Sequence, residues 1–123
     1  MAGAPKILTH QMRDVTIVNL NDSSILDTLQ VEQIGESLDE LVDGRACRKI
    51  IIDFAKVKFL SSSALGMLIR LRKKATEIKG QVVLCGLRDE IMQVFKISRL
   101  DKLFKIVKNE EKALTFFGVT SAG

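Results

Sequence analysis

Residues 49–74 constrain the fold more than any other stretch, because a buried strand and a helix follow each other within it. Residues 50–52 are three consecutive isoleucines, a β-branched run typical of a strand buried on both faces of a parallel or mixed sheet. From Ala64 onward, apolar residues return at helical spacing with basic residues between them. The stretch therefore predicts a strand, a short loop and an amphipathic helix in succession.

Three consecutive serines, Ser61, Ser62 and Ser63, stand where the loop becomes the helix. A serine at a helix N-cap accepts a hydrogen bond from an unpaired N–H of the first turn, so one of the three is predicted to be a cap. The N-terminus of a helix also favours an anion, so a phosphate on a remaining hydroxyl would be tolerated without unfolding. Two interpretations stay open: three structural loop and capping residues, or a cap beside a phosphorylation switch.

The rest of the chain alternates between strand and helix patterns. Strands are predicted at residues 6–12, 14–21, 48–54, 81–85 and 103–107, and helices at residues 28–43, 64–79, 88–96 and from residue 109. The order β-β-α-β-α-β-α-β-α predicts an α/β fold, a single domain over residues 1–123 with a mixed central β-sheet and about four helices. Gly80 is predicted to end the second helix as its C′ residue, and Asn109 to cap the last helix.

Few features favour an enzyme. His10 is the only histidine and lies near the N-terminus, so a Ser-His-Asp arrangement would depend on one poorly placed base. Asp53 ends its predicted strand near the serines, but a carboxylate there is typical of a turn or cap. The sequence has no nucleophile elbow, no Gly-rich phosphate loop and no Cys–His cluster, so we expect no catalytic residue, no metal and no cofactor. Cys47 and Cys85 are expected to be small buried fillers.

Charge and composition point to a protein partner. The net charge of +4 comes without Trp or Tyr, and the six Phe fall in apolar patterns, so we expect no direct nucleic-acid partner. The basic excess predicts either a solvated helix face or a surface matched to an acidic protein partner. No apolar run is long enough to span a bilayer, and residues 1–11 lack the apolar core of a secretory signal. We therefore expect a cytoplasmic protein that does not contact a membrane.

A family resemblance rests on residues 50–68, Ile-Ile-Ile-Asp-Phe-Ala-Lys-Val-Lys-Phe-Leu-Ser-Ser-Ser-Ala-Leu-Gly-Met-Leu. This stretch resembles the signature of STAS domains, in particular the bacterial anti-sigma factor antagonists: a strand ending in Asp, a spacer, then Phe-x-Asp-Ser-Ser-Gly-Leu-Gly. The similarity continues through residues 25–27, 79–84 and 97–104 and extends over nearly the whole chain. The element order predicted above agrees with the fold of this family.

Matching by position, the resemblance implies that Ser63 is the phosphorylated residue, with Ser62 as the alternative. The sequence departs from the family pattern at Ser61, where Asp is usual, at Ala64, where Gly is usual, and at Arg99, where Gly is frequent. Losing the Asp removes a charge beside the modified hydroxyl, which bears on recognition by a kinase. Whether Ser63 is phosphorylated is therefore left open.

The resemblance implies a non-catalytic binding module that regulates transcription, as in a stress response, by partner switching. The unphosphorylated protein would bind an anti-sigma factor and free a sigma factor; that partner, a serine kinase with a histidine-kinase-like ATPase fold, would phosphorylate Ser63. A metal-dependent serine phosphatase would restore the hydroxyl. The alternatives are a constitutive STAS scaffold or subunit of a stress-sensing or lipid-transport complex, and a small hydrolase that uses Ser63. Which sigma factor is freed and whether the protein dimerises are left open.

The resemblance also implies a partner-binding surface that includes the exposed start of the second helix. Its predicted members are Asp22, Ser24, Asp27, Ser61, Ser62, Ser63 and Met67.

Overall fold

The computed structural model describes residues 7–119, and a five-stranded sheet lies at its centre. The strand order is β1 (Ile7–Met12), β2 (Val15–Leu20), β4 (Lys49–Asp53), β6 (Gln81–Cys85) and β7 (Lys105–Val107). β1 pairs antiparallel with β2, and all other neighbours are parallel. The predicted mixed sheet and the initial hairpin are therefore confirmed. Residue 6, the start of the first predicted strand, lies outside the described residues.

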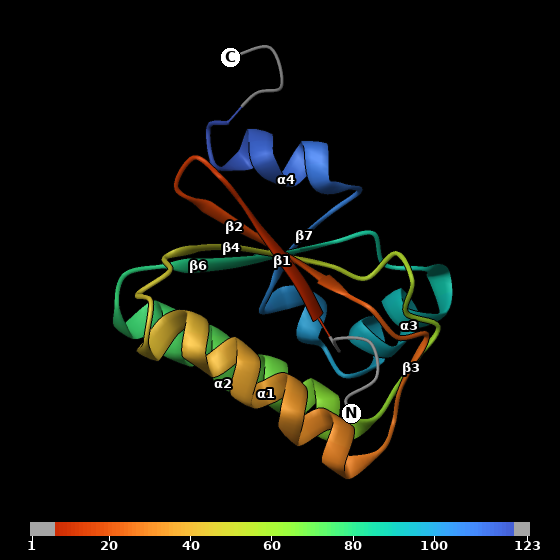
Figure 1. Ribbon diagram of the computed structural model, residues 1–123. Coiled ribbons are helices and arrows are strands. Elements are labelled where there is room, and N and C mark those ends of the chain that lie inside the picture. Colours follow the sequence, from red (N-terminus) through yellow and green to blue (C-terminus); the bar gives the residue numbers. More distant parts are fainter. Residues whose placement is uncertain (1–6, 120–123) are drawn as a thin grey trace.

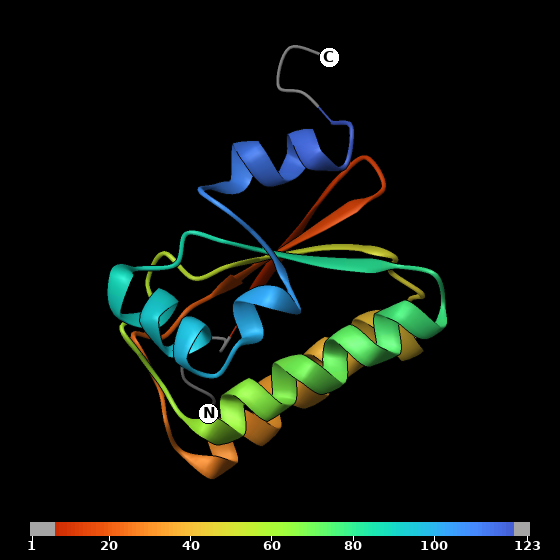
Figure 2. The ribbon, with the colours of Figure 1, turned by 180° about the vertical axis from the view of Figure 1, so that it is seen from behind.

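Helices cover both faces of the sheet. α1 (Thr28–Asp43), α2 (Ser62–Glu77) and α3 (Asp89–Ile97) lie on one face, and α4 (Glu110–Phe116) lies on the other (Figure 1). The view from behind shows the same layers, with α1 and α2 running side by side (Figure 2). The prediction of about four helices is confirmed, and a short 3-10 helix, η1 (Leu100–Lys102), is added between α3 and β7. Asn109 caps α4 as predicted, because its side chain accepts a hydrogen bond from the backbone N–H of Lys112 at 2.9 Å.

The core has two parts because successive strand residues point to opposite faces of the sheet. Ile50 and Ile52 pack in the larger cluster under α1, α2 and α3, whereas Ile51 packs in the smaller cluster under α4. A central strand with a helical layer on each side needs apolar residues on both faces, and the run of three isoleucines supplies them. Phe95 of α3 closes the larger cluster through edge-to-face contacts with Phe54 and Phe104, each with ring centroids 6.2 Å apart.

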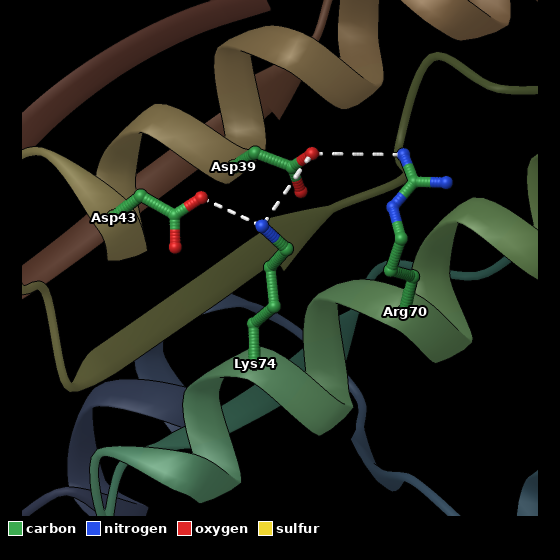
Figure 3. Close-up of polar contacts among 4 residues, drawn as sticks. All are labelled: Asp39, Asp43, Arg70 and Lys74. Atoms are coloured by element: carbon green, nitrogen blue, oxygen red, sulfur yellow. Dashed lines mark hydrogen bonds and ion pairs between the residues drawn. The ribbon is translucent and has the colours of Figure 1, made fainter.

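Ion pairs join the outer surfaces of α1 and α2 (Figure 3). The Lys74 ammonium lies 2.6 Å from Asp43 and 4.0 Å from Asp39, and Arg70 lies 3.6 Å from Asp39. The hydrogen bond to Asp43 raises the pKa of Lys74. Gly35 permits this close packing, because a Cβ atom there would lie 3.0 Å from the Arg70 guanidinium. These pairs are partly exposed to solvent, so each contributes little to stability.

The structure differs from the predicted elements in three places. Two short parallel strands, β3 (Ser24–Ile25) and β5 (Phe59–Leu60), form a second sheet that the sequence analysis missed. The strand predicted at residues 103–107 begins only at Lys105, because η1 and its turn occupy the preceding residues. Leu29 and Ile69 fit the helical stripes but are exposed, since each lies at the edge of its stripe.

The end of α2 corrects the predicted role of Gly80. The left-handed residue after the C-cap is Lys79, with φ 62°, and Gly80 follows it. The Gly80 N–H donates to the Ala75 carbonyl at 2.7 Å, which completes a Schellman-type ending. Gly80 is needed for another reason: a Cβ atom there would lie 2.6 Å from the backbone carbonyl oxygen of Arg48. The turn that ends α2 and the residue before β4 therefore touch backbone to backbone.

Gly80 has this backbone contact and Gly66 has none, so replacing each with alanine should change the free energy of unfolding in opposite directions. Gly80→Ala forces backbone atoms apart and should lower the free energy of unfolding by about 1–3 kcal/mol. Gly66→Ala, in the middle of α2 with no atom within 4 Å of the added Cβ, should raise it by about 0.5–1 kcal/mol. Urea unfolding of both variants measures the difference. Equal stabilities for the two variants would contradict the backbone contact.

Candidate functional site

Residues 54–61, which we call the serine loop, connect the carboxyl end of β4 to α2 and include β5 of the small second sheet. β5 precedes the serines, and Phe59 and Leu60 pair in parallel with Ser24 and Ile25 of β3. The Ser61 N–H extends this pairing by donating to the Ile25 carbonyl at 3.0 Å. The structure therefore brings the serine loop beside the segment after β3. This is the juxtaposition that the predicted partner-binding surface requires.

Of the three serines, only Ser61 caps the helix. Its hydroxyl oxygen accepts a hydrogen bond from the backbone N–H of Ala64 at 3.1 Å. Ser62 and Ser63 occupy the first turn of α2, and both are exposed. The capping role thus accounts for one hydroxyl and leaves two accessible at the positive end of the helix.

A hydrogen-bonded corner at the start of α1 joins three of the predicted site residues. Asp27 is the N-cap, and its carboxylate accepts from the Gln30 N–H at 3.1 Å. The Gln30 side chain donates to the Asp22 carboxylate and to the Ser24 carbonyl, both at 2.9 Å. Gln30 therefore fixes Asp22, Ser24 and Asp27 relative to one another. Sequence reasoning missed Gln30, although its position three residues after a cap is a usable signal.

The expectation that Met67 is exposed is wrong. Met67 is only 4% exposed and packs between α2 and α1, where a Cβ atom on Gly35 would lie 3.3 Å from its side chain. Exposed apolar side chains at this end of the molecule instead include Leu26 (53% exposed), Leu29 (62%) and Phe59 (57%). Exposed large apolar residues beside polar groups are typical of protein interfaces. We call Leu26, Leu29, Phe59, Ser62 and Ser63 the serine-end surface.

Asp53 at the end of β4 forms a carboxyl pair with Glu110. The Asn19 amide donates to Glu110 at 2.9 Å and to Asp53 at 3.4 Å, and the Ala55 N–H donates to Asp53 at 2.8 Å. Burial, and then the hydrogen bond with Glu110, raise the pKa of Asp53 to about 6. The same hydrogen bond lowers the pKa of Glu110. Because the pKa of Asp53 is raised and that of Glu110 is lowered, the first proton that the pair takes up resides on Asp53, and the pair joins the first turn of α4 to the end of β4.

The other reactive side chains considered in the sequence analysis are Cys47, Cys85 and His10. Cys85 is buried, which raises the pKa of its thiol to about 12, and Cys47 is half-buried. His10 lies on the exposed part of β1. Within residues 7–119, no three His, Cys, Asp or Glu side chains form a group that could hold a metal ion. No helix in that range is both long enough and apolar enough to cross a membrane.

Comparison with known proteins establishes the family. The profile of the STAS domain matches residues 6–113. The chain belongs to the STAS domain family. Among curated STAS relatives, the anti-sigma F factor antagonist of Paenibacillus polymyxa is 29% identical over 109 residues, which cover 89% of this chain and 92% of the relative.

Solved STAS structures share the fold. An anti-sigma-factor antagonist (STAS) domain protein from Planctomyces limnophilus has a TM-score of 0.82 at 23% identity, covering 93% of this chain and 98% of that chain. The Bacillus cell fate determinant SpoIIAA in its phosphorylated form has a TM-score of 0.70 at 22% identity, covering 90% and 98%. These likenesses confirm the predicted STAS-like architecture.

The three departures from the usual STAS pattern each have a structural account. Ser61 replaces Asp but still caps α2, because either side chain can accept the N–H bond. Ala64 replaces Gly and is fully buried in the first turn of the helix. Arg99 stands where Gly is frequent and adopts a left-handed conformation with φ 63°. Only the change at Arg99 places a side chain in backbone geometry that favours glycine.

The carboxyl pair makes the stability of this STAS domain depend on pH. The pKa of Asp53 lies above its ordinary value of 3.8, so the folded state holds the proton more tightly than the unfolded chain. The contribution of Asp53 to the free energy of unfolding therefore falls as the pH rises from about 4 to about 6. Asp53→Asn keeps an acceptor for Ala55 and a donor toward Glu110 without the charge. We expect Asp53→Asn to raise the Tm at about pH 8 and to leave it unchanged at about pH 4.

Asp14→Asn is the matched control. The hydrogen bond to Lys49 lowers the pKa of Asp14, so removing this carboxylate should not raise the Tm at the higher pH. Thermal unfolding followed by circular dichroism at both pH values tests the pair. A Tm gain for Asp53→Asn that is the same at both pH values would contradict the raised pKa of Asp53.

Proposed function

We propose that this STAS domain is an anti-sigma factor antagonist whose serine-end surface binds an anti-sigma factor. The observation that carries the proposal is the exposure of two hydroxyls in the first turn of α2, beside Leu26, Leu29 and Phe59. A serine hydroxyl within an apolar contact area allows binding of a partner to be switched, because a phosphate on the hydroxyl would add charge to that area. The curated relative from Paenibacillus polymyxa is an anti-sigma F factor antagonist, which supports the same role.

Phosphorylation of Ser63 is the switch in this proposal. A kinase of histidine-kinase-like ATPase fold, the anti-sigma factor itself, transfers the γ-phosphoryl group of ATP to the Ser63 hydroxyl oxygen. An O–P bond forms, the bond between the γ-phosphorus and its bridging oxygen breaks, and the hydroxyl proton passes to a base. The domain supplies the acceptor and is not an enzyme. A metal-dependent serine phosphatase hydrolyses the phosphoserine and restores binding.

The phosphate acts on the interface and not on the fold. It adds about −1.5 to −2 charges and a strong hydration shell among apolar side chains that a partner must desolvate. The helix N-terminus stabilises the anion, and Ser61 keeps the cap, so α2 stays folded. Release of the anti-sigma factor therefore needs no rearrangement of the core.

Intact-mass measurement with ATP and a histidine-kinase-like anti-sigma factor from the same organism tests the switch. We expect a gain of about 80 Da, the mass of one phosphoryl group, for the unchanged chain and for Ser62→Ala. Ser63→Ala should show no gain. A gain lost only in Ser62→Ala would move the switch to Ser62. Stable binding with no gain in any variant would favour the constitutive STAS scaffold over the partner switch.

A second experiment tests the apolar contacts of the serine-end surface. Phe59→Ala should weaken binding of the anti-sigma factor by about tenfold or more, because exposed aromatic side chains dominate such interfaces. Phe116→Ala, which removes another exposed Phe at the far end of α4, is the matched control and should leave the Kd unchanged. Isothermal titration calorimetry measures both. Equal losses for the two variants would place the partner elsewhere.

A further inference from the structure

A second surface lies at the opposite end of the molecule, where the parallel strands begin. The turn between α1 and β4, the turn between α2 and β6, and the C-terminal end of α4 meet there (Figure 1). These three segments are far apart in the sequence. We call the following residues the basic-end surface: Arg45, Arg48, Lys49, Lys79, Lys105 and Phe116.

Two hollows share the centre of this surface. One, of about 460 Å³, is lined by Arg48, Lys49 and Lys79 together with Phe116 and Phe117. The other, of about 480 Å³, is lined by the same Arg48 and Lys49 together with residues that include Arg45. The two hollows therefore form neighbouring parts of one basic depression.

Hydrogen bonds fix the turn that carries Lys79 and anchor the side chain of Arg48. The Arg48 side chain donates from Nε to the Ile78 carbonyl at 2.9 Å, so its guanidinium is anchored to the end of α2. The backbone of Arg48 also touches the turn at Gly80. Lys79 extends from the left-handed position of that turn. Side chains on fixed turns lose less conformational entropy when they bind a ligand.

The charge of the depression favours carboxylates. Asp14 is the only acidic residue among the side chains that line the two hollows, and its carboxylate lies 2.8 Å from the Lys49 ammonium. This ion pair gives the Lys49 ammonium a carboxylate partner within the chain. Arg48, Lys79 and Arg45 supply the further positive charge, and guanidinium groups bind carboxylates in a planar, two-point geometry.

The aromatic side chains favour a peptide over a nucleic acid. Phe116 is 42% exposed, but the Lys105 ammonium lies 5.2 Å from its ring centroid, and Phe117 packs at its edge with centroids 5.4 Å apart. The ring face under Lys105 is therefore not open to a stacked base. Its exposed part instead offers contact to an apolar side chain beside the acidic groups of a peptide.

We infer that the basic-end surface docks an acidic peptide segment of a partner protein, with an apolar residue of the segment against Phe116. This site is separate from the serine-end surface. α2 has 16 residues, so its two ends are about 24 Å apart. One partner can therefore occupy the serine end while the acidic segment of another is held at the basic end, whatever the state of Ser63.

Fluorescence anisotropy with the full chain at low salt tests the inference. The probe is a short fluorescein-labelled peptide of Glu residues interrupted by two Leu, and a Gln version of it is the neutral control. The double variant Arg48→Gln, Lys79→Gly removes two charges, and glycine suits the left-handed backbone at position 79. We expect the double variant to bind the Glu peptide about tenfold more weakly.

The double variant Lys56→Gln, Lys58→Gln is the matched control. It also removes two positive charges, but from the serine loop at the other end of the molecule, and it should change the Kd of the Glu peptide by less than about twofold. Ser63→Asp should leave peptide binding unchanged, so this result is independent of the phosphorylation switch. Melting curves confirm that each variant is folded.

Three results would overturn the inference. Equal weakening by both double variants would mean that only net charge attracts the peptide. Equal binding of the Glu and Gln peptides would exclude recognition of carboxylates. Tighter binding of oligouridine RNA than of the Glu peptide would make the surface a nucleic-acid site.

Discussion

The fold depends on the burial of β4 between two parallel neighbours and two helical layers. Ile51 packs toward α4 while Ile50 and Ile52 pack toward α1 and α2, so a single strand ties both halves of the core together. Parallel pairing places all the loops that leave β2, β4 and β6 at one edge of the sheet. The serine loop lies at that edge, and the turns that carry the basic-end surface lie at the opposite edge, where the parallel strands begin.

The common direction of the two crossover helices, α1 and α2, also explains why the two ends of the molecule differ in charge. α1 and α2 both begin at the serine edge and end at the basic edge (Figures 1 and 2). Their N-termini present unpaired N–H groups that favour anions, which suits caps such as Asp27 and Ser61. At their C-termini, cations are favoured, and Arg45, Arg48 and Lys79 stand in the turns that follow.

The sequence predicted most of the element order, because long helices and buried strands carry clear periodicity. It missed β3 and β5, since two-residue strands have no period to detect. The sequence also predicted an exposed Met67 and a buried Leu29, and both predictions are wrong. The spacing of apolar residues does not determine how a helix is rotated about its axis against the neighbouring elements. The pairing of Asp53 with Glu110 joins distant parts of the chain, so no local pattern indicates it. The serines were found because they mark the boundary between two strong patterns.

The small sheet of β3 and β5 has a consequence for how firmly the serine loop is held. It holds the serine loop by two residue pairs and by the bond from the Ser61 N–H to Ile25, separately from the ladder of the main sheet. Ile25 of β3 and Val57 of the serine loop are fully buried in the larger core cluster, so opening the small sheet would also expose apolar core. The serine loop is therefore anchored by packing as well as by hydrogen bonds, and the first turn of α2 presents Ser62 and Ser63 to solvent at a fixed position.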